Sequence, residues 1–264
     1  MNNFSYITPK ENRALIRGGK YTQQTSGMSM GYLQVNVVIL PKDFANDFQK
    51  YCVNNSKACP LLEVTDVGSI DAGKLATEVD VRVDLPKYQI FKNGLLVDSP
   101  DDILNYWQDD FVTFYLGCSF SFEDKLLEEG FKLRHIVEGR NVPMYKSNLP
   151  CASVGPFKGN MVVSMRPFLK EDISKVSQIT KEFSFAHGDP IHMGDPEAIG
   201  IGDINNPDFG DAVTINSNEI PVFWACGVTA LEAVKSAKLD IAITHAPGCM
   251  LICDVLSDDL QGNR

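Results

Sequence analysis

The sequence predicts an α/β protein, because segments with the pattern of strands alternate with segments with the pattern of helices. The clearest case is C-terminal, where a predicted strand at 221–226 (PVFWAC) is followed by a helix at 229–238 and a second strand at 240–244 (DIAIT). A strand–helix–strand unit predicts two parallel strands joined by a right-handed crossover. We therefore expect Cys226 and His245 to lie at the same edge of one sheet, where open α/β folds bind their ligands.

Further elements follow from local patterns along the chain. Segments 32–40 (YLQVNVVIL) and 161–165 (MVVSM) are short, apolar and rich in β-branched residues, which predicts buried strands. Segments 43–54 and 170–183 carry apolar residues at helical spacing, which predicts amphipathic helices. No repeat or long linker interrupts the chain, which favours one compact unit with at most an inserted subdomain.

Capping signals predict two more helices. In segment 99–107 (SPDDILNYW) a serine precedes a proline, and an aspartate stands three positions after the serine, as at a capped helix start. Segment 121–130 (SFEDKLLEEG) also has an aspartate, Asp124, three positions after a serine, with Ser121 as the predicted cap and Gly130 as the stop. Thr229 is the predicted cap of the C-terminal helix.

The composition bounds the class of protein and its partners. The 264 residues are 44% hydrophobic and 22% charged, as in ordinary globular proteins, and the formal net charge is -10. This charge disfavours nucleic acid and anionic membranes as partners, because both need a surplus of Lys and Arg. No apolar run approaches the roughly 20 residues of a membrane helix, and the N-terminus lacks the pattern of a signal peptide. Seven cysteines without a CxxC pair favour a reduced compartment. We expect a cytoplasmic protein with a small-molecule substrate, and oligomerisation remains open.

The segment 185–203 (FAHGDPIHMGDPEAIGIGD) holds two of the four histidines. Its prolines and glycines exclude a continuous helix. One interpretation is that the loop brings His187 and His192 together with Asp189 or Asp195 around a divalent cation, although the spacing matches no fixed ligand pattern. The competing interpretation is an ordinary loop whose aspartates bond to their own backbone.

Cys226 and His245 are the candidate catalytic residues of the C-terminal third. Cys226 lies between a strand end and a helix start, where backbone N–H groups and the helix dipole are expected to lower the pKa of a thiol. His245 follows a strand and precedes a Pro/Gly turn, a position typical of catalytic side chains. The competing interpretations are a small residue packing a turn for Cys226, and a histidine satisfied by its neighbours for His245.

Three polar residues are candidates for binding a substrate carboxylate. A predicted strand at 111–118 leads into the helix at 121–130, so free N–H groups there and the hydroxyls of Ser119 and Ser121 form a predicted anion cradle. Simple capping explains Ser121 equally well. Arg166 follows the strand at 161–165 and is a candidate fork for a carboxylate, with a surface ion pair as the competing interpretation. We count Thr229 as a fourth substrate-binding candidate.

The order of these segments resembles a known family. The segments that carry the resemblance include TSGMSMGYLQVNVVILP, CPLLEVTDVG, GCSFSFE, VVSMRP, HGDPIHMGDPEAIGI, PDFGD, IPVFWACGVT and ITHAPGCMLICD. Together they are similar to the hydro-lyase family that is also called the D-glutamate cyclase family, from about residue 13 to residue 254. The resemblance implies a three-layer α/β main domain, at about 1–120 plus 221–264, with a smaller two-layer α+β subdomain inserted at about 121–220.

The resemblance also implies an activity, that of a carbon–oxygen lyase acting on a small amino or hydroxy acid. The reaction attributed to a member is dehydration of D-glutamate to 5-oxo-D-proline. Two departures from the family pattern bear on this expectation: Ala230 and Leu231 replace the usual Pro-Gln, and Cys249 replaces a usual histidine. The alternative is therefore a non-catalytic protein that binds small carboxylic acids.

The hypothesis for this reaction gives His245 the role of base toward the substrate ammonium group and His187 or His192 the role of acid. Cys226 is either a proton donor or a nucleophile that forms a thioester with the γ-carboxyl group. The competing enzyme mechanism is a metal-assisted lyase, in which His187, His192 and Asp195 hold a cation that polarises the carboxyl group.

Overall fold

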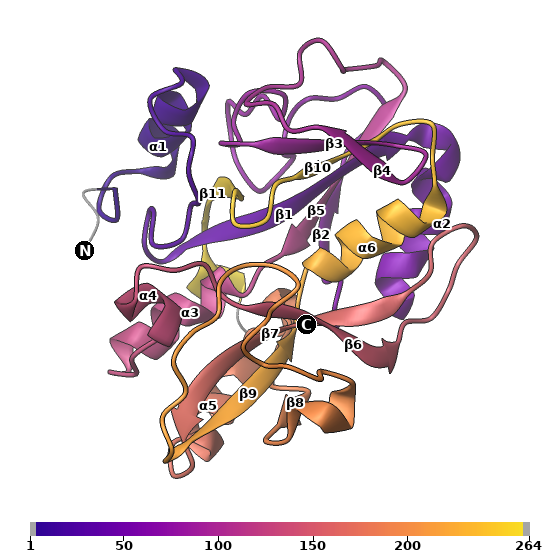
Figure 1. The fold of residues 1–264 in the computed structure, drawn as a ribbon. Coiled ribbons are helices and arrows are strands. Elements are labelled where there is room, and N and C mark those ends of the chain that lie inside the picture. The colour runs from indigo at the N-terminus through magenta and orange to yellow at the C-terminus, as the bar shows by residue number, and fades with distance from the viewer. Residues whose placement is uncertain (1–3, 261–264) are drawn as a thin grey trace.

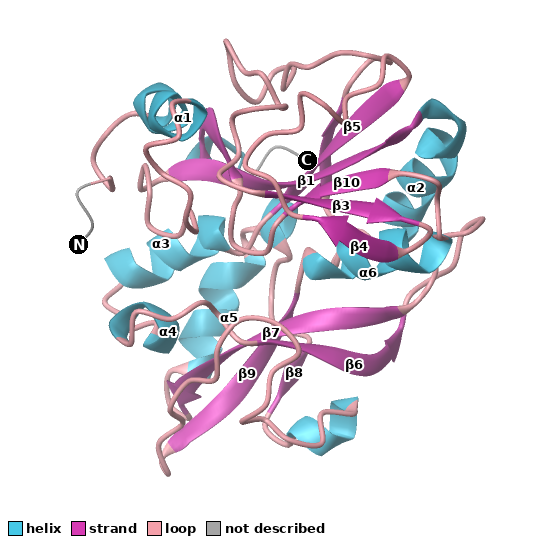
Figure 2. Cartoon of the chain, turned by 45° about the horizontal axis from the view of Figure 1, so that its top comes forward, coloured by secondary structure: helices cyan, strands magenta, loops and turns pink. Residues whose placement is uncertain are grey.

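Two antiparallel β-sheets organise the chain, as the computed structural model of residues 4–260 shows (Figure 1, Figure 2). The larger sheet has seven strands: β2 (Leu61–Val64), β5 (Phe111–Gly117), β1 (Tyr32–Pro41), β10 (Ala242–His245), β3 (Tyr88–Lys92) and β4 (Leu95–Asp98) in this spatial order, and β11 (Leu251–Leu256), which pairs with β1. The smaller sheet has the order β6 (Met144–Pro150), β7 (Asn160–Leu169), β9 (Glu219–Ala225) and β8 (His192–Met193).

The described residues form six α-helices and three short 3-10 helices. The α-helices are α1 (Pro9–Arg17), α2 (Lys42–Asn54), α3 (Phe120–Glu128), α4 (Arg134–Val137), α5 (Ile173–Lys181) and α6 (Val228–Ala237). The 3-10 helices are η1 (Ser184–Ala186), η2 (Pro196–Ile199) and η3 (Ser257–Leu260). None of the helices within residues 4–260 combines the length and apolar character that crossing a membrane requires.

The predicted α/β class is confirmed, and most predicted elements are present. The predicted strands at 32–40 and 161–165 are β1 and β7, and the predicted helices at 43–54 and 170–183 are α2 and α5. The helix predicted at 99–107 is wrong, because this segment forms turns. The hydroxyl of its first residue, Ser99, donates to the Tyr88 carbonyl at 2.9 Å instead of capping a helix.

The predicted parallel pair of strands is also wrong. Every strand pairing in the described part of the chain is antiparallel. The strand β9 pairs with β7 and β8 in the smaller sheet, whereas β10 pairs with β1 and β3 in the larger one. Helix α6 thus connects two sheets instead of crossing over within one. The division of the chain into a main domain and an inserted subdomain stays a prediction. The boundary expected near residue 221, where the chain would re-enter the main domain, falls inside β9.

The core is divided by the two sheets. Helices α2 and α6 cover one face of the larger sheet, and α6 also packs on β7, so that it lies between the sheets (Figure 2). Irregular segments at 66–87 and 99–110 cover the opposite face. The smaller sheet is covered by α3 and α5 on one face and by segment 199–215 on the other. The ends of β5 and β9 are thereby enclosed between the sheets.

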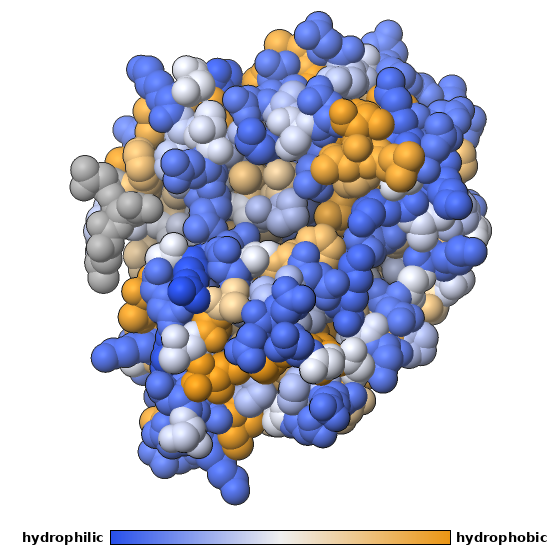
Figure 3. Space-filling model, viewed as in Figure 1, coloured by the Kyte–Doolittle hydropathy of each residue, from blue (hydrophilic) through white to orange (hydrophobic). Residues whose placement is uncertain are grey.

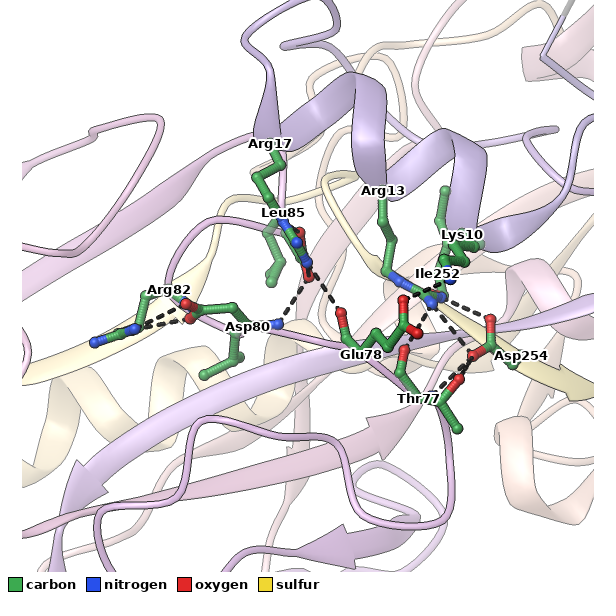
Figure 4. Close-up of polar contacts among 12 residues, drawn as sticks. Lys10, Arg13, Arg17, Thr77, Glu78, Asp80, Arg82, Leu85, Ile252 and Asp254 are labelled. Atoms are coloured by element: carbon green, nitrogen blue, oxygen red, sulfur yellow. Dashed lines mark hydrogen bonds and ion pairs between the residues drawn. The ribbon is translucent and has the colours of Figure 1, made fainter.

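Helix α1 is fixed to the larger sheet by two arginines, of which Arg13 is buried and Arg17 is exposed (Figure 4). The side chain of Arg13 is 2% exposed, and its guanidinium donates to Asp254 at 2.9 Å and to the Thr77 carbonyl at 3.1 Å. One turn later, Arg17 donates to both carboxylate oxygens of buried Asp84, at 2.8 and 2.6 Å. These paired, planar contacts fasten α1 to the irregular segment that covers the outer face of the sheet.

A close backbone contact joins the larger sheet to the loop that carries His187. A Cβ atom added to Gly117, the last residue of β5, would lie 1.6 Å from the carbonyl oxygen of Phe185. Real Cβ atoms do not approach another atom so closely, so only glycine lets the two backbones meet here. The loop at 185–187 is therefore seated on the end of β5.

We predict that Gly117→Ala lowers the free energy of unfolding by roughly 1–3 kcal/mol, since a methyl group forced against a backbone carbonyl must displace it. Gly202→Ala is the matched control, because a Cβ at Gly202 meets nothing within 4 Å. Urea denaturation of both variants checks the prediction. Equal stability of Gly117→Ala and Gly202→Ala would show that the loop does not press on β5.

Candidate active site

A small buried cavity lies where the ends of several strands meet between the two sheets. It has a volume of about 20 Å³, enough for about one water molecule. Its polar lining includes Asn36 of β1, Cys118 and Ser119 after β5, His187, Cys226 after β9, and His245 at the end of β10. Three of the four predicted catalytic residues, His187, Cys226 and His245, thus line one cavity.

Two strand–cysteine–helix corners form the floor of this cavity. Cys118 stands between β5 and α3, and Cys226 stands between β9 and α6, with both thiols lining the cavity. The first residues of both helices, Phe120 and Val228, line it as well. The positive ends of two helix dipoles therefore lie at the same cavity, which favours binding of a negative group.

The thiols at these corners are protonated at neutral pH. Burial raises the pKa of Cys226 to about 11, although the N–H groups of Val228 and Gly227 and the charge of Arg166 act in the opposite direction. Burial likewise raises the pKa of Cys118 to about 12. The expectation that a helix start lowers the pKa of Cys226 is therefore wrong, because the loss of hydration outweighs the helix amides.

His245 is held by the central strand of the larger sheet. Its side chain is buried, and Nδ1 lies 3.1 Å from the backbone nitrogen of Val37 and 3.2 Å from the Val37 carbonyl oxygen. These contacts engage Nδ1 and leave Nε2 for the cavity. Burial lowers the pKa of His245 to about 4, so the imidazole is neutral at pH 7.

His187 forms the wall between the cavity and a larger surface cleft. The cleft measures about 980 Å³, and His187 lines both spaces. Its Nδ1 lies 2.9 Å from the Lys57 carbonyl oxygen, so Nδ1 must carry the proton and Nε2 is an acceptor. Burial lowers the pKa of His187 to about 4. Its backbone φ of 83° is uncommon for a residue other than glycine and costs about 1–3 kcal/mol, which the surrounding packing sustains.

His192 lies away from this cavity. It is in β8, at the edge of the smaller sheet, and its Nε2 donates to the Asp195 carbonyl at 2.6 Å. The Asp195 carboxylate accepts from the backbone N–H of Glu197 at 3.0 Å, as in the Asx-turn interpretation of this loop. Within residues 4–260 no three His, Cys, Asp or Glu side chains are grouped to hold a metal ion. The predicted ligands His187, His192 and Asp195 are thus not brought together.

Arg166 lies behind the cavity in a buried ion pair. Its Nε donates to Glu123 Oε1 at 2.9 Å, one terminal nitrogen also contacts Glu123, and the other donates to Ser164 at 2.9 Å. The terminal nitrogen that contacts Glu123 also donates to Ser119 Oγ at 3.0 Å. The Arg166 guanidinium therefore binds a carboxylate of this chain, that of Glu123, and not a substrate carboxylate as predicted. Arg166 also positions Ser119, which lines the cavity.

The ionisation of Glu123 depends on its burial and on its neighbours Arg166 and His135. Burial acts to raise its pKa, but the charge of Arg166 and the nearby His135 imidazole, 3.3 Å away, together lower it to about 2. The exposed fractions of the Arg166 and Glu123 side chains are 0% and 2%. A fully ionised pair is thus enclosed between α3 and β7.

The other two predicted substrate-binding residues, Ser121 and Thr229, lie inside the helices that they were predicted to cap, because the N-cap positions are Ser119 and Gly227. Ser121 lies inside the first turn of α3, two residues after the N-cap position at Ser119, and its buried hydroxyl has no partner among the described residues. Thr229 Oγ1 accepts from the backbone N–H of Val162 at 3.0 Å and donates to the Val162 carbonyl at 3.3 Å, which ties α6 to β7. Neither residue lines the cavity.

Sequence reasoning missed Asn36 and Cys118. The Asn36 amide donates to the Gly117 carbonyl at 2.6 Å, and a Cβ on Gly227 would lie 2.4 Å from its nitrogen. Asn36 therefore touches both strand–cysteine–helix corners. The available signal was a polar residue within the apolar run YLQVNVVIL, where a buried amide needs a specific partner.

Neutral imidazoles, protonated thiols and two helix starts around one enclosed cavity are typical of the site of a small-molecule enzyme. A sequence model described as D-glutamate cyclase matches residues 112–254. The chain therefore belongs to the D-glutamate cyclase family.

Full-length relatives support this assignment. The protein "Putative hydro-lyase YcsI" of Bacillus subtilis is 51% identical over 254 residues, covering 96% of this chain and 99% of the relative. A protein of Staphylococcus carnosus named "Putative hydro-lyase" is 47% identical over 261 residues, covering 99% of this chain and 100% of the relative. Among solved structures, a nitrogen repressor-like protein of Methanococcus jannaschii overlaps 89% of this chain and 91% of its own, with 10% identity and a TM-score of 0.39, too low to carry an inference.

The departures from the family pattern lie outside the cavity lining. Leu231 is buried in the core formed by α6 and the larger sheet. The thiol of Cys249 is 3.8 Å from the Gln23 carbonyl oxygen. Neither side chain lines the cavity in the described structure, so these two substitutions leave its polar groups in place.

We predict that Glu123→Gln lowers the free energy of unfolding by about 3–5 kcal/mol at pH 7, because the variant leaves the Arg166 charge buried without its partner. The unfolded chain protonates Glu123 near pH 4.5, whereas the folded protein keeps it ionised down to about pH 2. The free energy of unfolding of the wild type therefore falls as the pH drops from about 4.5 to about 2. Over the same range, the difference in this free energy between the wild type and Glu123→Gln becomes smaller.

Chemical denaturation at pH 7 and at several values between pH 4.5 and 2 measures this difference. Glu128→Gln is the control on the same helix, since the exposed Lys125–Glu128 pair at 3.2 Å is screened by water and contributes little to stability. If both variants lost equally little stability at pH 7, the ion pair between α3 and β7 would not be a structural requirement.

Proposed function

We propose that this protein is a carbon–oxygen lyase that dehydrates D-glutamate to 5-oxo-D-proline in the cavity lined by His187, Cys226 and His245. The family and the names of its relatives support a hydro-lyase. The observation that carries the proposal is the convergence of two neutral imidazoles and two protonated thiols on one cavity at two helix starts.

The reaction requires protons to move from nitrogen to oxygen. The amine attacks the γ-carboxyl carbon, a C–N bond forms, a C–O bond breaks, and the departing oxygen leaves as water. The ammonium group loses two protons in total, and the departing oxygen gains two, so the reaction consumes no external acid or base. A site for this reaction needs a base near the amine and a proton donor near the carboxyl group.

His245 is suited to the role of base. Nδ1 faces the Val37 backbone, where it accepts from the Val37 N–H at 3.1 Å in one tautomer and donates to the Val37 carbonyl at 3.2 Å in the other. The role of base requires the second tautomer, which presents an unprotonated Nε2 to the cavity. With a pKa of about 4, the imidazole is available as an acceptor throughout the neutral range. His187 also presents an acceptor Nε2, because its Nδ1 proton is committed to the Lys57 carbonyl.

Cys226 is suited to the role of proton donor. Its pKa of about 11 keeps the S–H proton in place at neutral pH, which disfavours a thiolate that attacks the carboxyl carbon. The N–H groups at the start of α6 and the Ser119 hydroxyl would bind the substrate carboxylate. None of the described lining residues is Asp, Glu, Lys or Arg, so backbone dipoles and neutral donors would do this work.

Substrate entry requires the site to open. The cavity has room for about one water molecule, whereas the adjoining cleft of about 980 Å³ accommodates a small acid easily. His187 separates the two spaces, and its segment is secured by the 2.6 Å ion pair between Lys57 and Asp189. We propose that substrate enters from the cleft as the segment around His187 moves.

The direct test is incubation of the purified protein with a panel of D- and L-amino acids and hydroxy acids, with loss of water followed by mass spectrometry. We expect conversion of D-glutamate to a product of the mass and chromatographic mobility of 5-oxo-D-proline. Tight binding of D-glutamate or 5-oxoproline without conversion would contradict the enzyme and support a carboxylate-binding protein.

We predict that His245→Ala lowers kcat/KM at least about a hundredfold with the fold intact, because a positioned base contributes about 10²–10⁴ in rate. His192→Ala is the control histidine, since it lies outside the cavity and is expected to keep kcat/KM within a few-fold of wild type. Circular dichroism confirms folding of both variants. Wild-type rates in His245→Ala would remove this residue from the mechanism.

A further inference from the structure

The free edge of the larger sheet carries an exposed apolar strand. β4 is the last strand in the spatial order, and within the described residues it pairs only with β3. Leu95, Leu96 and Val97 are 69%, 52% and 51% exposed. Figure 3 shows a compact hydrophobic patch over this part of the molecule, in the region where Figure 1 places β4.

The segment after β4 extends this apolar surface. Tyr106 donates its hydroxyl proton to Asp98 at 2.6 Å, which folds the segment 99–106 back beside the end of β4. Leu104 in this segment is 51% exposed. Three adjacent large apolar residues on an open strand edge are unusual in a protein that works alone, since such edges are commonly protected by charge, proline or a covering element.

The charges around β4 favour a second copy of this chain as the occupant. Lys92 faces Leu95 across the hairpin at one end of β4, and Asp98 ends the strand at the other. Neither Lys92 nor Asp98 has an ion-pair partner among the described residues. The hydrogen bonds from Tyr106 and from the Ser99 backbone lower the pKa of Asp98, so it is ionised at neutral pH.

Antiparallel pairing of two β4 strands would make these features complementary. Strands in such a pair run in opposite directions, so the turn end of one copy lies beside the Asp98 end of the other. Lys92 and the second copy's Asp98 are then about two strand spacings apart, on the order of 10 Å between backbones, which their side chains can bridge. The two-fold axis repeats this contact, so the exposed apolar strand of each copy is buried against the other.

We propose that this protein forms a symmetric dimer in which β4 pairs with β4 of a second copy, joining the two larger sheets into one. The apolar side chains supply the buried surface, the strand edges supply the hydrogen bonds, and the Lys92–Asp98 contacts set the direction of pairing. The dimer does not depend on the proposed reaction, because β4 contributes no residue to the cavity.

Sedimentation velocity of the full chain over a range of concentrations tests the dimer. We expect wild-type protein to sediment as a dimer, and L96K/V97K to raise the dimer dissociation constant at least about tenfold. Val53→Lys is the matched control, because Val53 is 63% exposed on α2, away from the sheet edge, and its variant should remain dimeric. A monomeric wild type, or L96K/V97K as dimeric as wild type, would overturn the proposal.

A charge exchange tests the direction of pairing separately. Lys92→Asp alone places like charges together and should weaken the dimer, whereas K92D/D98K restores opposite charges and should recover at least part of the lost affinity. Wild-type affinity in Lys92→Asp, or no recovery in the double variant, would contradict the antiparallel arrangement. Circular dichroism of each variant separates loss of pairing from loss of folding.

Discussion

The buried ion pair between Arg166 and Glu123 determines how the two sheets meet. Glu123 belongs to α3, which continues directly from β5 of the larger sheet, and Arg166 belongs to β7 of the smaller sheet. The guanidinium also lies over the rings of Phe122 and Trp224, 5.1 and 5.5 Å from their centroids. Because both charges are removed from water, their attraction must offset a large desolvation cost, and only a well-formed contact can do so.

This requirement also fixes the geometry of the cavity. The terminal nitrogen of Arg166 that contacts Glu123 donates to Ser119, so the start of α3 cannot move without disturbing the ion pair. On the other side, the Asn36 amide and the side-chain-free Gly227 bring the start of α6 against β1. The start of α3 is therefore held by a contact from the smaller sheet, and the start of α6 by a contact from the larger sheet. The geometry of the cavity between them depends on both contacts.

Local structure could be predicted from the sequence, but strand pairing could not. The segments for β1, β7, β9, α2, α5 and α6 carry their own periodicity, whereas the partner of a strand depends on residues far away in the chain. The strand–helix–strand pattern at the C-terminus is compatible with a crossover within one sheet or between two, and the structure has the second. Cys226 and His245 do line one cavity, but they come from two different sheets and not from one sheet edge. The capping signal at Ser99 failed because its hydroxyl binds the Tyr88 carbonyl, a tertiary contact.

The same distinction between local and tertiary effects explains the chemistry of the site. A helix start lowers the pKa of a nearby thiol when the thiol is hydrated, and the sequence shows only the helix start. Enclosure reverses the outcome: the pKa of Cys226 is raised to about 11, and the pKa values of His187 and His245 are lowered to about 4. Burial thus favours the neutral form of each group, so at pH 7 each thiol keeps its proton, and each imidazole carries one N–H and one unprotonated nitrogen. Such a cavity offers bases and proton donors side by side without any of them neutralising another, as an internal proton transfer from nitrogen to oxygen requires.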